Sequence, residues 1–386
     1  MRTLAFILLT LVAVTLQARA DDSFRDGEKA FLKARELLQK GYVDDKLSDD
    51  KMWRAATDGL LHGVGNGKWD ELLSPSKLAA MKADLVGEVV GLGVQIEVDS
   101  DAGIVDVRGV VPNSGAERAG LMVGDKILRL DGKTFKGMSK DEVARTMRGK
   151  AGTSATLTIL RDAEMVTKTI KRSAFVVDPV VTAMLPGGVG LVQIKMITSK
   201  TPALVSAALD KLRGMKGLVV DLRDNQGGRY DTMFDVAGLM LPKGALVVSE
   251  IRRGGAVVEK HTSAEPRVTV PIVVLVDNMT ASGAEVLAGA LKQAGAKVVG
   301  KRTMGKWNAQ ELYELGNGWG IKYTIMVFRA ASGAMLDGKG LEPDVEVEAD
   351  PAMVAQANVM KDGEKRLAAD AQLRVATTIL KLKLGR

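Results

Sequence analysis

The stretch Thr280–Glu285, which reads T-A-S-G-A-E, joins an apolar run to a helical pattern. The run before it, P-I-V-V-L-V-D at residues 271–277, is typical of a buried strand. After it, apolar residues recur at helical spacing over residues 284–294. Ser282 therefore lies where a strand turns into a helix, and the first N–H groups of that helix have no partner within it. Such groups suit an oxyanion beside the serine, although serine is also a favoured residue for capping a helix.

A lysine follows this serine at a distance of 24 residues, in the sequence T-M-G-K at residues 303–306. A serine becomes a nucleophile only when a nearby base takes its proton, and lysine is one of the few side chains that can do so. The chain holds two histidines, of which His62 lies in a helical pattern and His261 in a polar, turn-like stretch. The sequence therefore predicts a pair of Ser282 and Lys306 rather than a histidine triad.

Both segments resemble the nucleophile and lysine segments of the C-terminal processing peptidases, also called tail-specific proteases. The matching runs are T-A-S-G-A-E-V-L-A-G-A-L at residues 280–291 and V-V-G-K-R-T-M-G-K-W-N-A-Q at residues 298–310. The resemblance implies Ser282 as the nucleophile, Lys306 as the base and Gln310 as the residue that orients the lysine. Trp307 departs from the family pattern, which has glycine at this position.

A second segment, K-G-L-V-V-D-L-R-D-N-Q-G-G at residues 216–228, resembles the family's strand followed by L-R-N-N-P-G-G. Paired glycines let a backbone N–H group approach a reacting group closely. The resemblance implies an oxyanion hole formed by Gly227 or Gly228 together with Gly283. An ordinary turn at the end of a strand would also account for these glycines, and Gln226 replaces the family's proline.

Residues 89–174 resemble a PDZ domain. The sequence G-L-G-V is like the PDZ loop whose backbone N–H groups bind the terminal carboxylate of a peptide, and it comprises Gly91, Leu92, Gly93 and Val94. A helix expected over residues 139–148 would flank the groove and offer Val143 and Met147 to apolar side chains. The implied partners are protein or peptide substrates with apolar C-termini.

The expected fold class is a multidomain α/β (α+β) chain with a crotonase-like protease core, an inserted PDZ domain and an N-terminal helical region. A third family match, G-K-G-L-E-P-D, lies near the end of the core and is expected to be structural. In the family the N-terminal region helps to build dimers, so a homo-oligomer stays open as a partner. An adaptor protein stays open as a second kind of partner. The expected order is a signal peptide at 1–20, helices at 21–88, the PDZ domain at 89–174, the core at 175–350 and C-terminal helices at 351–386.

The first 20 residues predict export. Arg2 precedes an almost wholly apolar run over residues 4–16, and A-R-A at residues 18–20 is the expected cleavage site. The run is too short to span a bilayer, and no other segment is long and apolar enough to do so. The mature chain is therefore expected in the periplasm or outside the cell.

Composition excludes several other classes of protein. The 386 residues carry a formal net charge of +7 and include no cysteine, so thiol catalysis and cysteine-bound zinc are excluded. The positive charge is spread along the chain without a basic block, so no nucleic-acid partner is expected. No metal and no organic cofactor is implied.

The predicted base needs a lowered pKa. At a reference pKa of about 10.4, only about 0.04% of lysine is neutral at pH 7, whereas a pKa of about 8 makes roughly 10% neutral. Burial lowers a lysine pKa, and Met304 and Trp307 are expected to supply apolar cover. Two rival classes are an inactive PDZ scaffold and a crotonase-like acyl-CoA enzyme. The first has no need of Ser282 and Lys306, and the second does not fit an exported chain with a PDZ domain.

Overall fold

The computed structural model describes residues 26–43, 47–64, 68–85, 88–138, 140–176, 179–360 and 362–385. The predicted export signal at residues 1–20 lies outside the described residues. The chain forms two compact units, which divide after Gly63. None of the described helices is both long and apolar enough to cross a membrane.

The first unit contains two helices, α2 (Gly27–Gly41) and α3 (Asp49–Val64), as the helical pattern predicts. The rings of Phe31 and Trp53 lie 5.8 Å apart, and the Arg35 guanidinium lies 4.8 Å from the centroid of the Trp53 ring. α2 buries none of its residues, and its apolar side chains remain at least partly exposed, even where Phe31 contacts Trp53.

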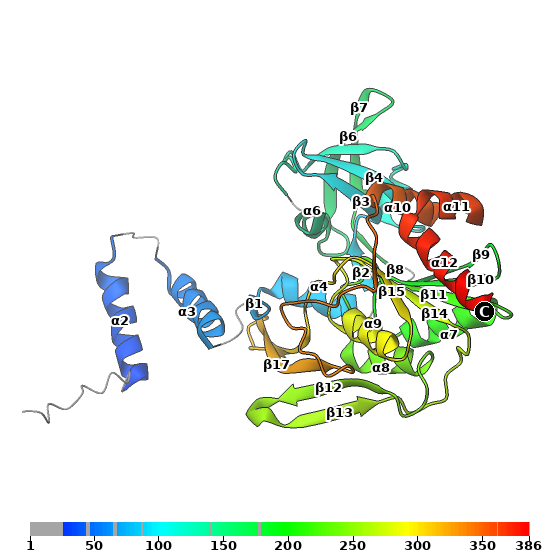
Figure 1. Ribbon diagram of the computed structural model, residues 1–386. Coiled ribbons are helices and arrows are strands. Elements are labelled where there is room, and N and C mark those ends of the chain that lie inside the picture. Colours follow the sequence, from blue (N-terminus) through cyan, green and yellow to red (C-terminus); the bar gives the residue numbers. More distant parts are fainter. Residues whose placement is uncertain are drawn as a thin grey trace, which may run out of the picture. The chain divides into compact units, whose positions relative to one another are not determined.

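The second unit is built on a six-stranded sheet with the order β18-β15-β14-β11-β10-β9 (Figure 1). Neighbouring strands are parallel except at the edge, where β9 runs antiparallel to β10. The inner strands are continuous apolar runs, as expected when both faces of a sheet are covered. The strands are β9 (Val180–Leu185), β10 (Val189–Ile194), β11 (Gly217–Asp221), β14 (Ile272–Val276), β15 (Lys297–Gly300) and β18 (Val345–Glu346).

Helices cover both faces of this sheet. One core joins it to α7 (Thr201–Lys211), α8 (Tyr230–Gly238) and α9 (Gly283–Gln293), and a second core joins the opposite face to α12 (Ala371–Leu384). Successive residues of a strand point to opposite faces, so Val220 lies in the first core and Val219 in the second. The last helix therefore packs on the core through Leu373, Ala376 and Leu380.

A buried ion cluster joins the end of β11 to the start of α12. Arg223 donates to Asp221 and, at 2.8 Å and 3.1 Å, to the two carboxylate oxygens of Asp370, whose carboxylate also caps α12 by accepting from Leu373 N–H. All three charged side chains are almost fully buried, and the two carboxylates raise the pKa of Arg223 although burial opposes this. The cluster fixes the start of the turn that leads to Gly227.

A second sheet has the order β1-β17-β12-β13, and β16 also pairs with β17. It matters here because β16 begins two residues after Lys306 and β17 carries Lys322, whose charge acts on Lys306. Its strands are β1 (Glu71–Leu73), β12 (Leu246–Arg252), β13 (Val257–His261), β16 (Asn308–Glu314) and β17 (Gly320–Ala330). The remaining elements are α4 (Pro75–Leu85), the 3₁₀ turn η1 (Arg253–Gly255), α10 (Pro351–Val359) and α11 (Gly363–Ala369).

The PDZ-like segment folds around its own core as an antiparallel sheet in the order β3-β4-β5-β6-β7. The chain enters this domain along β2 (Glu88–Gly91) and leaves it along β8 (Ser173–Val176), and these two strands pair antiparallel as a stem. Its other elements are β3 (Val94–Asp99), β4 (Ile104–Val110), α5 (Gly115–Arg118), β5 (Lys126–Leu130), α6 (Lys140–Met147), β6 (Ser154–Arg161) and β7 (Glu164–Lys171).

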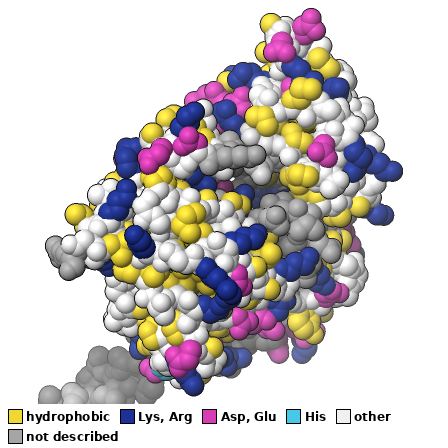
Figure 2. Space-filling view, turned by 90° about the vertical axis from the view of Figure 1, so that its right-hand side faces the viewer, with side chains coloured by type: hydrophobic (Ala, Val, Ile, Leu, Met, Phe, Trp, Pro, Cys, Tyr) yellow, Lys and Arg dark blue, Asp and Glu magenta, His cyan; other side chains and the backbone are white. Residues whose placement is uncertain are grey.

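The predicted fold class is confirmed, with a parallel-sheet core flanked by helices, an inserted antiparallel domain and N-terminal helices (Figure 1). Figure 2 shows one face of the molecule, on which Lys and Arg side chains are interspersed with Asp and Glu. Positive and negative side chains thus alternate over this face instead of gathering into a single-sign field.

Candidate active site

Ser282 lies between β14 and the first residue of α9, as predicted, but in a strained backbone conformation. Its φ of 55° and ψ of −125° fall outside the β region in which an ordinary N-cap residue lies. A non-glycine residue in such a region costs on the order of 1–3 kcal/mol, and it persists only where its surroundings fix it. The conformation resembles the sharp strand-to-helix turn that exposes a nucleophilic serine. Simple capping of α9 does not require this strain.

Three hydrogen bonds to two neighbouring segments fix the loop before Ser282. Thr280 Oγ1 donates to the carbonyl of Leu222 at 2.9 Å, and Ala281 N–H donates to the carbonyl of Asn225 at 2.9 Å. Met304 N–H donates to the carbonyl of Thr280 at 3.0 Å. The loop therefore has little freedom to relax away from its strained conformation.

Glu285 connects the serine segment to the lysine segment. Its fully buried carboxylate accepts five hydrogen bonds, and burial raises the pKa of Glu285 against the opposing effect of these donors. The donors are Ser282 N–H (3.0 Å), Gly305 N–H (2.8 Å), Lys306 N–H (2.7 Å), Trp307 Nε1–H (3.1 Å) and Thr303 Oγ1. One side chain thus sets the positions of both candidate catalytic residues. The sequence match includes this glutamate, but its spacing gives no indication of the five donors.

Lys306 follows Gly305 and precedes β16, and its side chain is half-buried. Burial, and to a smaller extent the positive charge of Lys322, lower the pKa of Lys306 to about 8 against the opposing effect of Glu285 and Asp337. This pKa is close to the value that the chemistry of a lysine base requires. Its Nζ lies 5.6 Å from the centroid of the Trp69 ring. Among the described residues, no hydrogen bond joins Lys306 Nζ to Ser282 Oγ.

Gln310 and Trp307 differ from their expected roles in this structure. Gln310 Nε2 donates to Asn308 Oδ1, beside a register shift in β16, and no hydrogen bond joins Gln310 to Lys306 among the described side chains. The Trp307 indole is fully buried, lies against Gly289 of α9 and donates to Glu285. The aromatic contact of the lysine ammonium is instead with Trp69, whose position here no sequence pattern indicates.

The glycine turn after β11 lies directly against Ser282. A Cβ built on Gly227 would lie 2.9 Å from Ser282 Cβ and 2.9 Å from Gly283 N, so only glycine fits. Gly227 N–H, however, donates to Asn225 Oδ1 at 2.8 Å. The N–H groups of Gly228 and Gly283 have no acceptor among the described residues. Of the three predicted oxyanion donors, two are therefore available, and the Gly227 N–H is already used within the turn.

Ile197 supports this turn from the loop that follows β10. Its N–H donates to the carbonyl of Gly227 at 2.9 Å, and its carbonyl accepts from Arg229 N–H at 2.8 Å. Its side chain is fully buried, and a Cβ built on Gly283 would lie 3.5 Å from Ile197 Cδ1. Ile197 thus contacts the segments that carry both available N–H groups.

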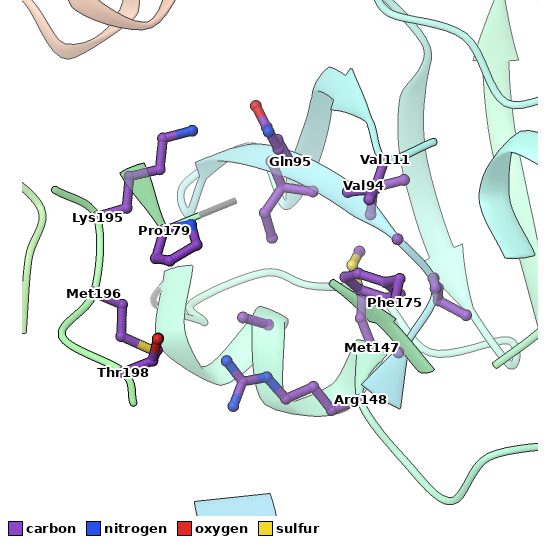
Figure 3. Close-up of a pocket in the computed structure, with 15 residues that line it drawn as sticks. Val94, Gln95, Val111, Met147, Arg148, Phe175, Pro179, Lys195, Met196 and Thr198 are labelled. Carbon is purple, nitrogen blue, oxygen red and sulfur yellow. The ribbon is translucent and has the colours of Figure 1, made fainter. Parts of the chain in front are cut away.

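A cavity of about 250 Å³ lies where the inserted domain meets this same loop (Figure 3). The G-L-G-V residues and Met147 line it, as predicted, and the N–H groups of Leu92 and Gly93 have no acceptor among the described residues. The protease core completes the wall with Pro179, Lys195, Met196 and Thr198.

The prediction that Val143 lines the groove is wrong. Its side chain is fully buried in the core of the inserted domain, and the cavity is lined instead by Ala144 and Met147 of α6 and by Arg148, which follows the helix. The contribution of core residues to the wall was also missed, since no sequence pattern brings the segment after β10 to the inserted domain.

The similarity of this chain to known proteins covers most of its length and not only the motifs around Ser282 and Lys306. The profile of peptidase family S41 matches residues 188–347, and that of a PDZ domain matches residues 107–161. A carboxyl-terminal-processing protease of Picosynechococcus sp. is 28% identical over 95% of this chain and 94% of its own length. A probable CtpA-like serine protease of Staphylococcus aureus is 31% identical over 90% of this chain and 71% of its own length. The solved structure of a photosystem II D1 C-terminal processing protease matches with a TM-score of 0.55 and 28% identity, covering 89% of this chain and 93% of that one.

Proposed function

The chain belongs to the carboxyl-terminal processing proteases of peptidase family S41, and from this premise we propose that it hydrolyses peptide bonds with Ser282 and Lys306. The observation that carries the proposal is the strained conformation of Ser282 beside the N–H groups of Gly228 and Gly283, for which the described part of the chain offers no acceptor. Strain that is kept by surrounding hydrogen bonds is characteristic of functional sites. The family shown by similarity over most of the chain is the one that the sequence motifs around Ser282 and Lys306 resemble.

In the proposed reaction, Ser282 Oγ attacks the carbonyl carbon of the substrate while the neutral amine of Lys306 takes the hydroxyl proton. The N–H groups of Gly228 and Gly283 bind the oxyanion of the tetrahedral intermediate. Lys306 then protonates the leaving amine as the C–N bond breaks, which leaves an ester on Ser282. A water molecule, deprotonated by Lys306, hydrolyses the ester and restores the serine.

Replacing the nucleophile tests this proposal directly. Ser282→Ala should abolish cleavage of a peptide with an apolar free C-terminus, because water and the oxyanion hole alone supply only a small part of the rate. The control is Ser263→Ala, an exposed serine after β13, which should cleave like the wild type. Cleavage by purified Ser282→Ala protein at the wild-type rate, measured by mass spectrometry of the products, would sink the assignment of the nucleophile.

We further propose that the cavity of Figure 3 binds the C-terminal tail of the substrate. The N–H groups of Leu92 and Gly93 support binding of a carboxylate, and Met147 supports an apolar final side chain. Arg148 and Lys195 add positive charge to the lining. The segment 195–198 lies between this cavity and the turn that carries Gly228, so tail and scissile bond would be bound at neighbouring places.

The export proposal rests on the apolar run and the A-R-A sequence at residues 18–20. It predicts a mature protein that begins at Asp21. N-terminal sequencing of the protein from the periplasmic or medium fraction checks this expectation, and recovery of an uncleaved N-terminus in those fractions would contradict it.

The two rival functions receive less support. An inactive scaffold would leave the strain of Ser282 and the lowered pKa of Lys306 without a role. An acyl-CoA enzyme of the crotonase type does not account for the family membership or for the inserted PDZ domain.

A further inference from the structure

The segment just after the first unit brings an indole to the lysine ammonium. The centroid of the Trp69 ring lies 5.6 Å from Lys306 Nζ and 4.8 Å from Lys68 Nζ. This segment is anchored next to the ring, because the buried Asp70 carboxylate accepts from Thr324 N–H at 2.8 Å and from Thr324 Oγ1 at 2.7 Å. The position of the indole is therefore built into the fold.

The strand that follows continues this anchoring. β1 pairs antiparallel with β17, in the register Glu71 opposite Lys322. The Glu71 carboxylate lies 3.6 Å from the Lys322 ammonium and also pairs with Lys77. Lys322 of β17 is a cation that acts on Lys306, so the pairing of β1 with β17 joins the segment that carries Trp69 to a strand that carries a charge near the proposed base.

Among the described residues, three charged side chains and one aromatic ring act on Lys306. Lys322 of β17 disfavours its charge, whereas Glu285 of α9 and Asp337 of the loop after β17 favour it. The indole of Trp69 also favours the charged form, since the face of an aromatic ring attracts an ammonium and does not attract a neutral amine in the same way. The ring therefore interacts differently with the two protonation states.

We propose that Trp69 holds the protonated side chain of Lys306 in a resting position and releases it toward Ser282 when the proton is lost. The absence of a hydrogen bond between Lys306 Nζ and Ser282 Oγ among the described residues agrees with such a resting position. One deprotonation thus both creates the base and ends its attraction to the indole. Trp69 is a positioning residue in this inference, which rests on the proposed role of Lys306.

Three variants of Trp69 separate the ring's electrostatic effect from its apolar cover. Trp69→Leu keeps the cover but loses the ring face, so the apparent pKa of the pH–rate profile should fall and the rate at pH 7 should rise about two- to fivefold. Trp69→Ala admits water to the ammonium, so the apparent pKa should rise and the rate at pH 7 should fall. Trp69→Phe keeps a ring face and should lie near the wild type.

The matched control is Trp319→Leu, in the turn between β16 and β17, which should leave the pH–rate profile unchanged. Thermal unfolding of every variant shows whether it is folded at the assay temperature. Identical pH–rate profiles for folded Trp69→Leu, Trp69→Phe and wild type would overturn the proposal.

A second measurement needs no catalysis. In protein labelled with ¹³C in its lysine ε-methylenes, the Lys306 signal, assigned by its absence from Lys306→Arg, should be displaced upfield by the ring. The displacement should shrink as pH rises through about 8. A Lys306 signal at the position of ordinary lysines at pH 6, or a displacement that does not change with pH, would overturn the resting position. Activity that survives Ser282→Ala would instead overturn the proposed function, so the two failures are distinct.

Discussion

The serine loop and the lysine loop are fixed to different degrees. Backbone hydrogen bonds and Glu285 fix Ser282 in a strained conformation, and the adjacent N–H groups of Gly228 and Gly283 have no acceptor within the part of the chain that the structure describes. The lysine loop has its backbone bound to the same carboxylate, but the Lys306 ammonium lies over Trp69 and Gln310 donates to Asn308. The proposed oxyanion site is thus preorganised, whereas the proposed base still has to engage the serine.

The largest expected effect comes from removing the base. Lys306→Arg should lower kcat at least about a thousandfold, because a guanidinium stays protonated and takes no proton from Ser282. Lys301→Arg, five residues earlier, is the control and should retain activity. In the wild type, the rate should rise with pH and level off above a pKa of about 8, since only the neutral amine acts as base. A rate that stays constant between pH 6 and 10 would contradict this role.

The shared carboxylate should have the next largest effect. Glu285→Gln replaces one of the two acceptor oxygens by an NH2 group, which faces backbone N–H donors. The resulting repulsion should displace both the serine loop and the lysine loop. We expect kcat to fall about 10- to 100-fold with little change in KM, and stability to fall by about 1–3 kcal/mol. Steady-state kinetics and urea unfolding measure the two effects, with the exposed Glu164→Gln as control. Unchanged kcat in folded Glu285→Gln would show that the two loops hold their positions without this carboxylate.

The tail cavity should affect binding rather than chemistry. Amidating the C-terminus of a peptide substrate removes the charge that the N–H groups of Leu92 and Gly93 are proposed to bind. KM should rise about tenfold, which corresponds to the loss of one charge-assisted hydrogen bond. A matched pair of free-acid and amidated peptides tests this expectation. Equal KM values for the two peptides would exclude recognition of the terminal carboxylate.

The smallest expected effect concerns stability alone. The folded-state pKa of Lys306, about 8, lies below its unfolded value, so the folded protein binds fewer protons between about pH 8 and pH 10 and becomes more stable as pH rises through that range. Lys306→Met removes this dependence and should stabilise the protein at pH 7 by on the order of 1 kcal/mol, because partial exposure reduces the upper limit of about 3 kcal/mol. Urea unfolding at pH 7 and pH 10 compares the two proteins. A difference in stability that does not shrink at pH 10 would contradict the lowered pKa.

The comparison also explains which parts were predictable from sequence. The strand before Ser282 and the helix after it follow from local patterns, since a run of buried apolar residues and a helical period need no distant partner. Lys306 was found through a motif, and the approximate pKa of a lysine base followed from chemistry alone. In contrast, Trp69 lies more than 200 residues from Lys306 in the sequence, and the pairing of β1 with β17 and the hydrogen bonds of Thr324 to Asp70 bring them together.

Two further differences have the same origin. The use of Gly227 N–H within its own turn depends on the rotamer of Asn225, which a motif does not specify. Val143 was placed in the groove because it shares a helix face with Met147, but the depth at which α6 enters the domain core decides which of these side chains reaches the cavity. Long-range packing, not local preference, determined both.

The antiparallel stem of β2 and β8 has a consequence for how this protein can be rebuilt. Gly91 and Ser173 are register partners, so the chain enters and leaves the inserted domain at adjacent points. Two antiparallel strands can be closed by a two-residue turn such as Asn-Gly. The whole domain can therefore be excised and replaced by a hairpin, or exchanged for another module whose ends lie equally close, without threading a new connection through the catalytic sheet. The fold thereby offers a natural position for grafting a different recognition domain onto the same hydrolytic core.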